Sequence, residues 1–110
     1  MNFIEGQGVL GKIQFLDGTM PAYDRTYLVV KTTNEYIEVL NVSTTKGKER
    51  KLAFPTNRRI KSYNPPFLKP SFVKLDSLTR VEKSLCDSLI ILNKGRVLDQ
   101  NELNVIQQLI

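Results

Sequence analysis

The chain has 110 residues, of which 41% are hydrophobic and 25% charged, a composition typical of a globular domain and not of a disordered chain. It contains no histidine and a single cysteine, Cys86, which excludes an internal disulfide, Ser-His-Asp and Cys-His catalysis and almost every zinc site. The formal net charge is +5 at pH 7. We therefore expect one domain over residues 1–110, without a metal or cofactor, in which any acid–base chemistry uses Asp, Glu, Lys, Arg, Tyr or a hydroxyl.

Neither the apolar runs nor the first residues of the chain indicate a membrane or secreted protein. The longest apolar runs, such as residues 89–92, are too short to cross a bilayer. The first five residues lack the basic and apolar regions of a signal peptide. Together with the single cysteine, these features predict a cytoplasmic protein.

Residues 8–15 alternate between apolar and polar side chains and predict a half-buried first strand. Val9, Ile13 and Phe15 share one side of this strand, and Lys12 and Gln14 share the other. The dipeptide Asp17-Gly18 then predicts a turn, followed by a loop up to residue 24.

Residues 24–30, Asp-Arg-Thr-Tyr-Leu-Val-Val, predict a strand buried on both faces, because its last four residues are bulky and apolar or β-branched. A second strand over residues 36–42 is close enough to form a hairpin with it. Arg25 lies at the start of the first of these strands, where its guanidinium suits a phosphate or a carboxylate. The alternative is an Arg that ends a strand and pairs with Asp24 or another surface acid.

Residues 46–61 carry most of the positive charge. This segment contains one acidic residue, Glu49, and seven basic residues: Lys46, Lys48, Arg50, Lys51, Arg58, Arg59 and Lys61. A charge of +6 over so short a stretch suits a polyanion, although a solvated loop is the alternative.

The remaining chain predicts more extended structure and then a helix. Residues 71–76 alternate, with Val73 and Leu75 on one face and Lys74 and Asp76 on the other, and the alternation continues to residue 81. Near the C-terminus, an N-cap at Asp99, with Glu102 three residues later, is typical of a capping box, and Leu98 and Leu103 are spaced as a hydrophobic staple. The apolar face of this helix is Leu103, Ile106, Leu109 and Ile110. Five or six short strands and one terminal helix predict a mainly β fold, closed as a small β-barrel.

Five short stretches, in order along the chain, resemble motifs of the MazF/PemK toxins, small bacterial endoribonucleases also called mRNA interferases. They are Gly11-Lys12-Ile13, Arg25-Thr26-Tyr27-Leu28-Val29-Val30, Ser43-Thr44-Thr45, Phe54-Pro55-Thr56-Asn57 and the block from Ser71 to Lys83. The resemblance covers most of the chain from residue 8 onward, and the capped terminal helix matches in place. It implies an SH3-like barrel with a C-terminal helix, a homodimer and an acidic antitoxin as partner.

The resemblance also implies a metal-independent cut of single-stranded RNA, in which a 2′-hydroxyl attacks the adjacent phosphate. Arg25 matches the family's catalytic Arg, Thr44 or Thr45 a phosphate-contacting hydroxyl, and Asp76 an acidic position used as a base. Lys74 stands where one branch of the family has a helping Arg. The expected RNA-binding residues are Lys46, Lys48, Arg50, Lys51, Lys74 and Ser77.

Other interpretations remain open at this point. Asp76 can equally pair with Lys74 at the surface, and Thr44 and Thr45 can serve a turn. Thr26 and Ser77 stand where the family has Pro and Gln, which leaves a non-catalytic RNA-binding barrel as one alternative. A toxin of the same fold that inhibits a protein such as a gyrase through its terminal helix is the other.

Overall fold

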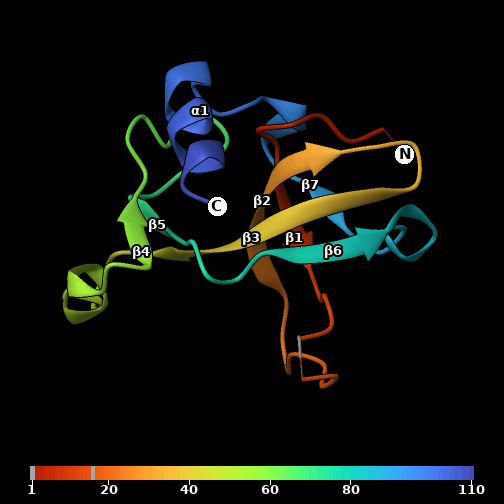
Figure 1. Ribbon diagram of the computed structural model, residues 1–110, viewed down its shortest axis with the longest axis horizontal. Coiled ribbons are helices and arrows are strands. Elements are labelled where there is room, and N and C mark those ends of the chain that lie inside the picture. Colours follow the sequence, from red (N-terminus) through yellow and green to blue (C-terminus); the bar gives the residue numbers. More distant parts are fainter. Residues whose placement is uncertain (1, 16) are drawn as a thin grey trace.

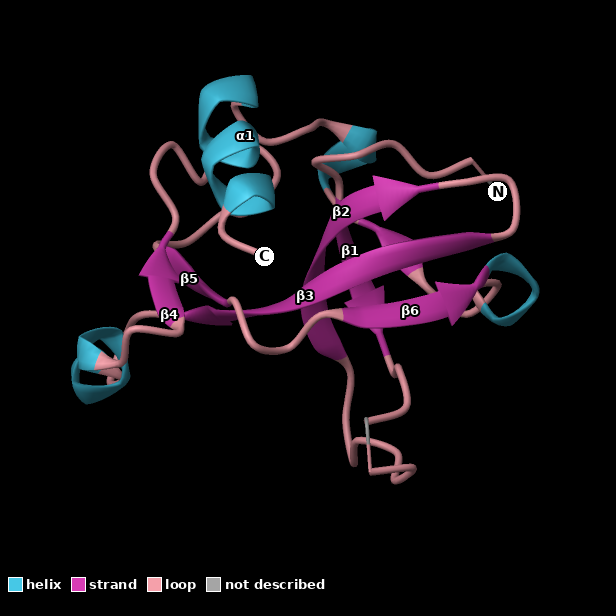
Figure 2. Ribbon diagram, viewed as in Figure 1, coloured by secondary structure: helices cyan, strands magenta, loops and turns pink. Residues whose placement is uncertain are grey.

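The protein is mainly β, with a terminal helix set against one side of a curved antiparallel sheet (Figures 1 and 2). The structure, a computed structural model, describes residues 2–15 and 17–110. The strands in these residues are β1 (Gly8–Gly11), β2 (Arg25–Thr32), β3 (Tyr36–Thr44), β4 (Asn57–Arg59), β5 (Ser71–Lys74), β6 (Thr79–Glu82) and β7 (Ile90–Ile91). The helices are the 3-10 turns η1 (Glu49–Ala53), η2 (Lys83–Leu85) and η3 (Asn93–Gly95), and the α-helix α1 (Gln100–Gln108).

The β2–β3 hairpin is the centre of the fold. Its strands pair antiparallel, with Tyr27 opposite Asn41, and a bulge interrupts the register between Val29 and Lys31. Because successive side chains point to opposite faces, the hairpin supplies two hydrophobic cores. Tyr27 and Val29 pack in one core, and Leu28 and Val30 pack in the other. The prediction of a strand buried on both faces is confirmed.

Strand β3 is long enough to pair with two short strands in succession. Its first half, Tyr36 to Val39, pairs with β6, and its last residues, Val42 to Thr44, pair with β5. The continuous extended run predicted from residue 71 to residue 81 is therefore wrong, because residues 75–78 form a turn between β5 and β6. The turn was not predicted because apolar and polar residues alternate through it as they do in a strand. The full strand order is β4-β5-β3-β2-β1-β7, with β6 beside β3.

Strand β1 ends at Gly11, four residues earlier than predicted. A β-carbon at Gly11 would lie 2.6 Å from Leu89 Cδ2, so the close approach to Leu89 requires glycine. Ile13 is still buried in the core, but Phe15 is 40% exposed, so the predicted apolar side of the strand is buried at Ile13 and not at Phe15. The predicted turn is confirmed, since the Gly18 amide donates to the Phe15 carbonyl.

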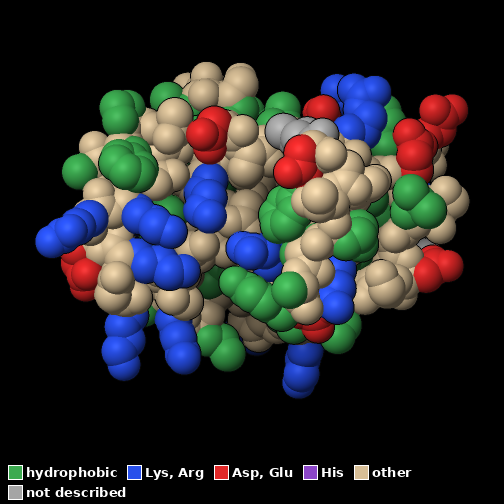
Figure 3. All heavy atoms as spheres, turned by 90° about the horizontal axis from the view of Figure 1, so that it is seen from below, with side chains coloured by type: hydrophobic (Ala, Val, Ile, Leu, Met, Phe, Trp, Pro, Cys, Tyr) green, Lys and Arg blue, Asp and Glu red, His purple; other side chains and the backbone are tan. Residues whose placement is uncertain are grey.

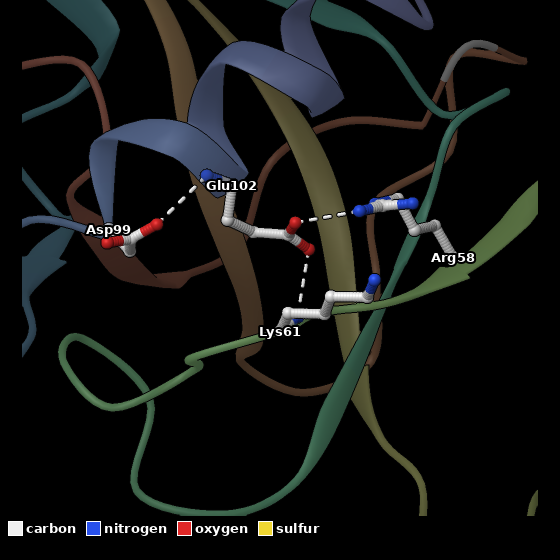
Figure 4. A network of polar contacts seen from close by, with 4 residues as sticks. All are labelled: Arg58, Lys61, Asp99 and Glu102. Carbon is white, nitrogen blue, oxygen red and sulfur yellow. Dashed lines mark hydrogen bonds and ion pairs between the residues drawn. The ribbon is translucent and has the colours of Figure 1, made fainter.

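Helix α1 begins as predicted, with the Asp99 carboxylate accepting a hydrogen bond from the Glu102 amide at 3.1 Å. The Glu102 carboxylate does not accept the reciprocal hydrogen bond from the Asp99 amide that a capping box requires. It is only 4% exposed, and it accepts from Arg58 Nη2 at 2.7 Å and from the Lys61 amide at 2.8 Å (Figure 4). The helix ends at Gln108, so Leu109 and Ile110 are exposed and the apolar face ends at Ile106.

The helix is attached to the sheet by apolar packing and by polar contacts. Leu98, Leu103 and Ile106 pack into the same core as Leu28 and Val30. The contacts of Glu102 join the helix to β4 and the chain that follows it. No helix in the described residues has the length and apolar character needed to cross a bilayer.

Candidate active site

A cleft of about 430 Å³ opens where β2 begins and β5 ends. Four of the residues expected at the site line it: Arg25, Lys74, Asp76 and Ser77. Arg25 lies two residues from Tyr27 on the same face of β2, and Tyr27 is opposite Asn41 of β3. The Asn41 amide donates to the Ser77 hydroxyl, which brings the turn after β5 to this part of the sheet. The other lining residues are Ile13, Gln14, Phe15, Asp17, Tyr27, Asn41 and Thr79.

Two aromatic rings hold the Arg25 side chain at this cleft. Its guanidinium carbon lies 4.8 Å from the centre of the Tyr23 ring and 5.3 Å from that of Phe15. One terminal nitrogen donates to the Tyr23 hydroxyl at 3.3 Å, while the buried Nε has no hydrogen-bond partner in the described residues. Arg25 also makes no ion pair with a carboxylate of those residues. The surface pair with Asp24 is therefore absent, and Arg25 has no direct ion pair, although the carboxylates of Asp17 and Asp76 line the same cleft.

Lys74 brings a second positive charge to the cleft. Burial, and then the positive charges of Lys51, Arg25 and Lys48, lower the pKa of Lys74 below its usual value, and Asp76 opposes the shift. A lysine with a lowered pKa releases its proton more readily and still attracts an anion while charged. The influence of Lys48 and Lys51 also means that part of the basic segment lies close to the cleft.

Asp76 and Ser77 belong to the turn between β5 and β6. Asp76 is exposed and makes no ion pair with Lys74 in the described residues, so its carboxylate is accessible at the cleft. The Ser77 hydroxyl donates to the Lys74 carbonyl at 2.6 Å and accepts from the Asn41 amide at 2.8 Å. These two bonds fasten the turn to β3, so Ser77 positions Lys74 and Asp76.

The two threonines lie outside this cleft. Thr44 lines a second cavity, which does not include Arg25 or Asp76. The Thr45 hydroxyl donates to the Pro70 carbonyl at 3.4 Å, and its amide donates to the same oxygen at 3.0 Å. Thr45 thus serves the chain path after β3, as the turn interpretation expects.

The basic residues of segment 46–61 have different roles: one forms an internal ion pair, and most of the others are exposed. Arg58 forms an ion pair with the buried Glu102, so it is not available to a ligand. Lys46, Arg50, Lys51 and Arg59 are exposed, and Lys48 is half-buried. Figure 3 views the end of the molecule from which the loop between β1 and β2 projects, and Lys and Arg side chains gather on the side where η1 and β4 lie in Figure 1.

Sequence reasoning missed several residues that line or adjoin the cleft, among them Phe15, Tyr23 and Asn41. Phe15 was assigned to the core side of a longer strand, and Tyr23 was treated only as part of a loop. Their sole signal was proximity to Arg25, since aromatic side chains interleaved with basic ones are typical of single-strand binding. Asn41, whose side-chain amide donates to the Thr26 carbonyl at 3.3 Å, gave no signal because it lies within an apolar strand.

Comparisons with models of known protein families and with curated proteins found no match for this chain.

Proposed function

We propose that this protein is a metal-independent endoribonuclease that cuts single-stranded RNA, of the kind found in MazF/PemK toxins. The observation that carries the proposal is the presence of Arg25, Lys74 and Asp76 on the wall of one cleft. A chain without histidine needs another base, another acid and a fixed positive charge for this reaction, and these three side chains are of the right types.

The reaction assigns one role to each of the three residues. The Asp76 carboxylate takes the proton of the ribose 2′-hydroxyl, and the 2′-oxygen forms a bond to the adjacent phosphorus. The bond from phosphorus to the 5′-oxygen breaks, and that oxygen takes a proton from Lys74, whose lowered pKa favours the transfer. Arg25 stabilises the additional negative charge of the phosphorane. The products are a 2′,3′-cyclic phosphate and a free 5′-hydroxyl.

The surroundings of Arg25 favour an unpaired strand as substrate. Tyr23 is 62% exposed beside the cleft, and Phe15 is 40% exposed on its wall. Exposed rings offer stacking surfaces to unpaired bases, and stacking tolerates any base sequence. The basic side chains Lys46, Lys48, Arg50 and Lys51 provide the sequence-independent attraction for the phosphate backbone.

The same proposal extends to the fold type and the partners. The curved sheet with its terminal helix is of the size and class of an SH3-like barrel, and a homodimer and an acidic antitoxin follow from the resemblance. The support from the chain itself for an acidic partner is the dense positive charge of residues 46–51, because opposite charges accelerate and orient association.

The test is incubation with a long single-stranded RNA in the presence of EDTA. We expect cleavage to survive chelation and to leave cyclic phosphate and 5′-hydroxyl ends. Arg25→Ala should lower the rate by about 10²–10³-fold, the usual loss for one group that stabilises transition-state charge. Arg59→Ala is the matched control, because Arg59 is exposed on β4 and does not line the cleft.

Two outcomes would replace the proposal with an alternative. RNA binding without cleavage would indicate a non-catalytic RNA-binding protein, consistent with the positions of Thr44 and Thr45 outside the cleft. Failure to bind RNA at all would indicate a toxin that acts on a protein target such as a gyrase. In that case the exposed Leu109 and Ile110 at the end of the terminal helix are the first surface to test.

A further inference from the structure

A second cavity, of about 270 Å³, lies on the opposite face of the hairpin from the Arg25 cleft. Strand β2 lines both cavities, since Arg25 faces the cleft and the next residue, Thr26, faces the second cavity. The other lining residues are Val42, Ser43, Thr44, Pro66, Phe67, Leu68, Lys69, Ser71, Leu92 and Asn93. We call this the Thr44 cavity.

The Thr44 cavity combines apolar walls with unused hydrogen-bonding groups. Val42, Phe67 and Leu92 belong to the core or pack against it and supply apolar surface. The side chains of Thr26 and Thr44 lie on the cavity side of their strands, and their hydroxyls make no hydrogen bond within the part of the chain that the structure describes. A hydroxyl both donates and accepts, so the two can meet a ligand edge that presents donors and acceptors in either order.

The size of the cavity limits the ligand. Sites that enclose drug-sized molecules usually measure about 300–1,000 Å³. A cavity of about 270 Å³ is slightly smaller and suits a single flat ring system. Asn93, in the left-handed region at φ 49°, adds an amide at its margin, and Lys69 adds an exposed positive charge.

The basic arm, residues 45–51, connects the two cavities. It begins at Thr45, whose amide and hydroxyl both bind the Pro70 carbonyl, between the lining residues Lys69 and Ser71. It continues through Lys48 to Lys51, whose carbonyl accepts from the Asn57 side-chain amide at 2.8 Å, and Asn57 is opposite Lys74 of the cleft in the β4–β5 pair. A polyanionic strand that follows this arm passes from the margin of one cavity to the other.

We propose that the Thr44 cavity binds one unpaired nucleobase of the RNA strand whose scissile phosphate lies in the Arg25 cleft. The inference rests on the proposed function, and it adds a base-recognition site on the opposite sheet face. An apolar side chain from a protein partner is the competing occupant. It would leave the hydroxyls of Thr26 and Thr44 unpaired and desolvated, which is costly, whereas a nucleobase offers partners to both of them.

The first experiment uses nucleosides, because they lack the phosphate that the Arg25 cleft is proposed to bind. Adenosine, cytidine, guanosine and uridine are titrated separately while methyl NMR signals of Thr26, Thr44 and Leu92 are followed. We expect one nucleoside to shift these signals more than the others. Thr44→Val, which keeps the shape and removes the hydroxyl, should weaken its binding about fivefold, corresponding to one ordinary hydrogen bond. Thr56→Val is the control, because Thr56 is exposed and lies outside both cavities.

The second experiment separates this inference from the ribonuclease proposal. Across a randomised RNA pool, Thr44→Val should relax the base preference at one position about fivefold, while Arg25→Ala should lower cleavage about 10²–10³-fold at every sequence. Cleavage with an unaltered preference, and no nucleoside shifts, would overturn the inference and leave the ribonuclease proposal intact. Nucleoside binding without any RNA cleavage would support the base site and refute the ribonuclease. Shifts caused by a leucine- or phenylalanine-containing peptide, and by no nucleoside, would overturn the inference in favour of a protein partner.

Discussion

The Arg25 guanidinium is held in place without a direct ion pair, which leaves it able to bind an anion. Its guanidinium is held by the faces of two rings and one long hydrogen bond, and its buried Nε has no partner in the described residues. Ring faces attract a cation without neutralising its charge. A carboxylate in the same place would fix the side chain equally well, but it would cancel the attraction for phosphate.

Tyr23 is the residue whose replacement tests this arrangement. Tyr23→Leu should lower the single-turnover rate of RNA cleavage about tenfold with a smaller change in KM, because the guanidinium loses its closest ring. Tyr23→Phe keeps the ring and should stay within about threefold of the original rate, since a cation–π contact contributes more here than a hydrogen bond of 3.3 Å. The variants should fold normally, because the Tyr23 side chain is 62% exposed.

A spectroscopic measurement makes the Tyr23 prediction independent of activity. The Arg25 Nε–H signal in a nitrogen-resolved NMR spectrum should be shifted by the ring currents and protected from solvent exchange. Tyr23→Leu should remove most of this protection, and Tyr23→Phe should keep it. Equal losses in the two variants would show that the hydroxyl, and not the ring, holds the guanidinium.

At the scale of elements, the turn between β5 and β6 and the basic arm act together on Lys74. The turn is fastened to β3 through the Ser77 hydroxyl, and the arm brings Lys48 and Lys51 near enough to repel the Lys74 ammonium. Because the pKa of Lys74 is lower in the folded protein than in the unfolded chain, its charged form destabilises the fold. This cost is present below the folded pKa and is relieved as the pH rises through it towards 10.5.

Lys51→Ala should therefore raise the pKa of Lys74, because it removes the largest contribution to the shift after burial. A titration followed through the Lys74 side-chain NMR signals measures this directly. The alkaline decline of RNA cleavage should move to higher pH in the same variant, since the proton donor stays charged for longer. Lys46→Ala is the control, as Lys46 is an exposed lysine of the same arm that does not contribute to the shift. An equal response to both substitutions would mean that general surface charge, not the position of Lys51, sets the pKa.

Local patterns predicted the elements that depend on local chemistry. The buried β2–β3 hairpin follows from its apolar and β-branched residues, and the helix start follows from Asp99. The end of β1 did not follow, because it is set by pairing with β2, whose first residue, Arg25, is opposite Gly11. The break between β5 and β6 was hidden for the same reason, since it depends on pairing of both strands with β3.

The candidate site was predictable to a similar extent. The resemblance to the MazF/PemK motifs identified Arg25, Lys74 and Asp76 as site residues, and these three line one cleft. The sequence neighbours Arg25 and Thr26 face different cavities, and Thr44 lies in the second one. Which face of the sheet a strand residue occupies depends on register and bulges, and spacing within a single strand does not determine how two strands align.

At the scale of the whole molecule, the terminal helix packs into one of the two cores beside the hairpin and is joined to β4 by the ion pair of the buried Glu102. Glu102 is 4% exposed and holds both Arg58 Nη2 and the Lys61 amide. These contacts fix β4, which follows the basic arm and η1 in the chain, against α1 (Figure 4). The position of the arm therefore depends on a carboxylate that takes no part in the proposed chemistry.

Glu102→Ala should lower the free energy of unfolding by about 2–4 kcal/mol, because it leaves the Arg58 guanidinium and the Lys61 amide without their partner. Urea denaturation measures the change, and the double variant with Arg58→Ala should show a coupling of about 1–3 kcal/mol. Glu38→Ala is the matched control. Its ion pair with Arg80 is longer, at 3.8 Å, and the Arg80 side chain is exposed, so its loss should cost about 0.5 kcal/mol or less. Equal losses for Glu102→Ala and Glu38→Ala would show that the buried pair does not hold the helix to the sheet.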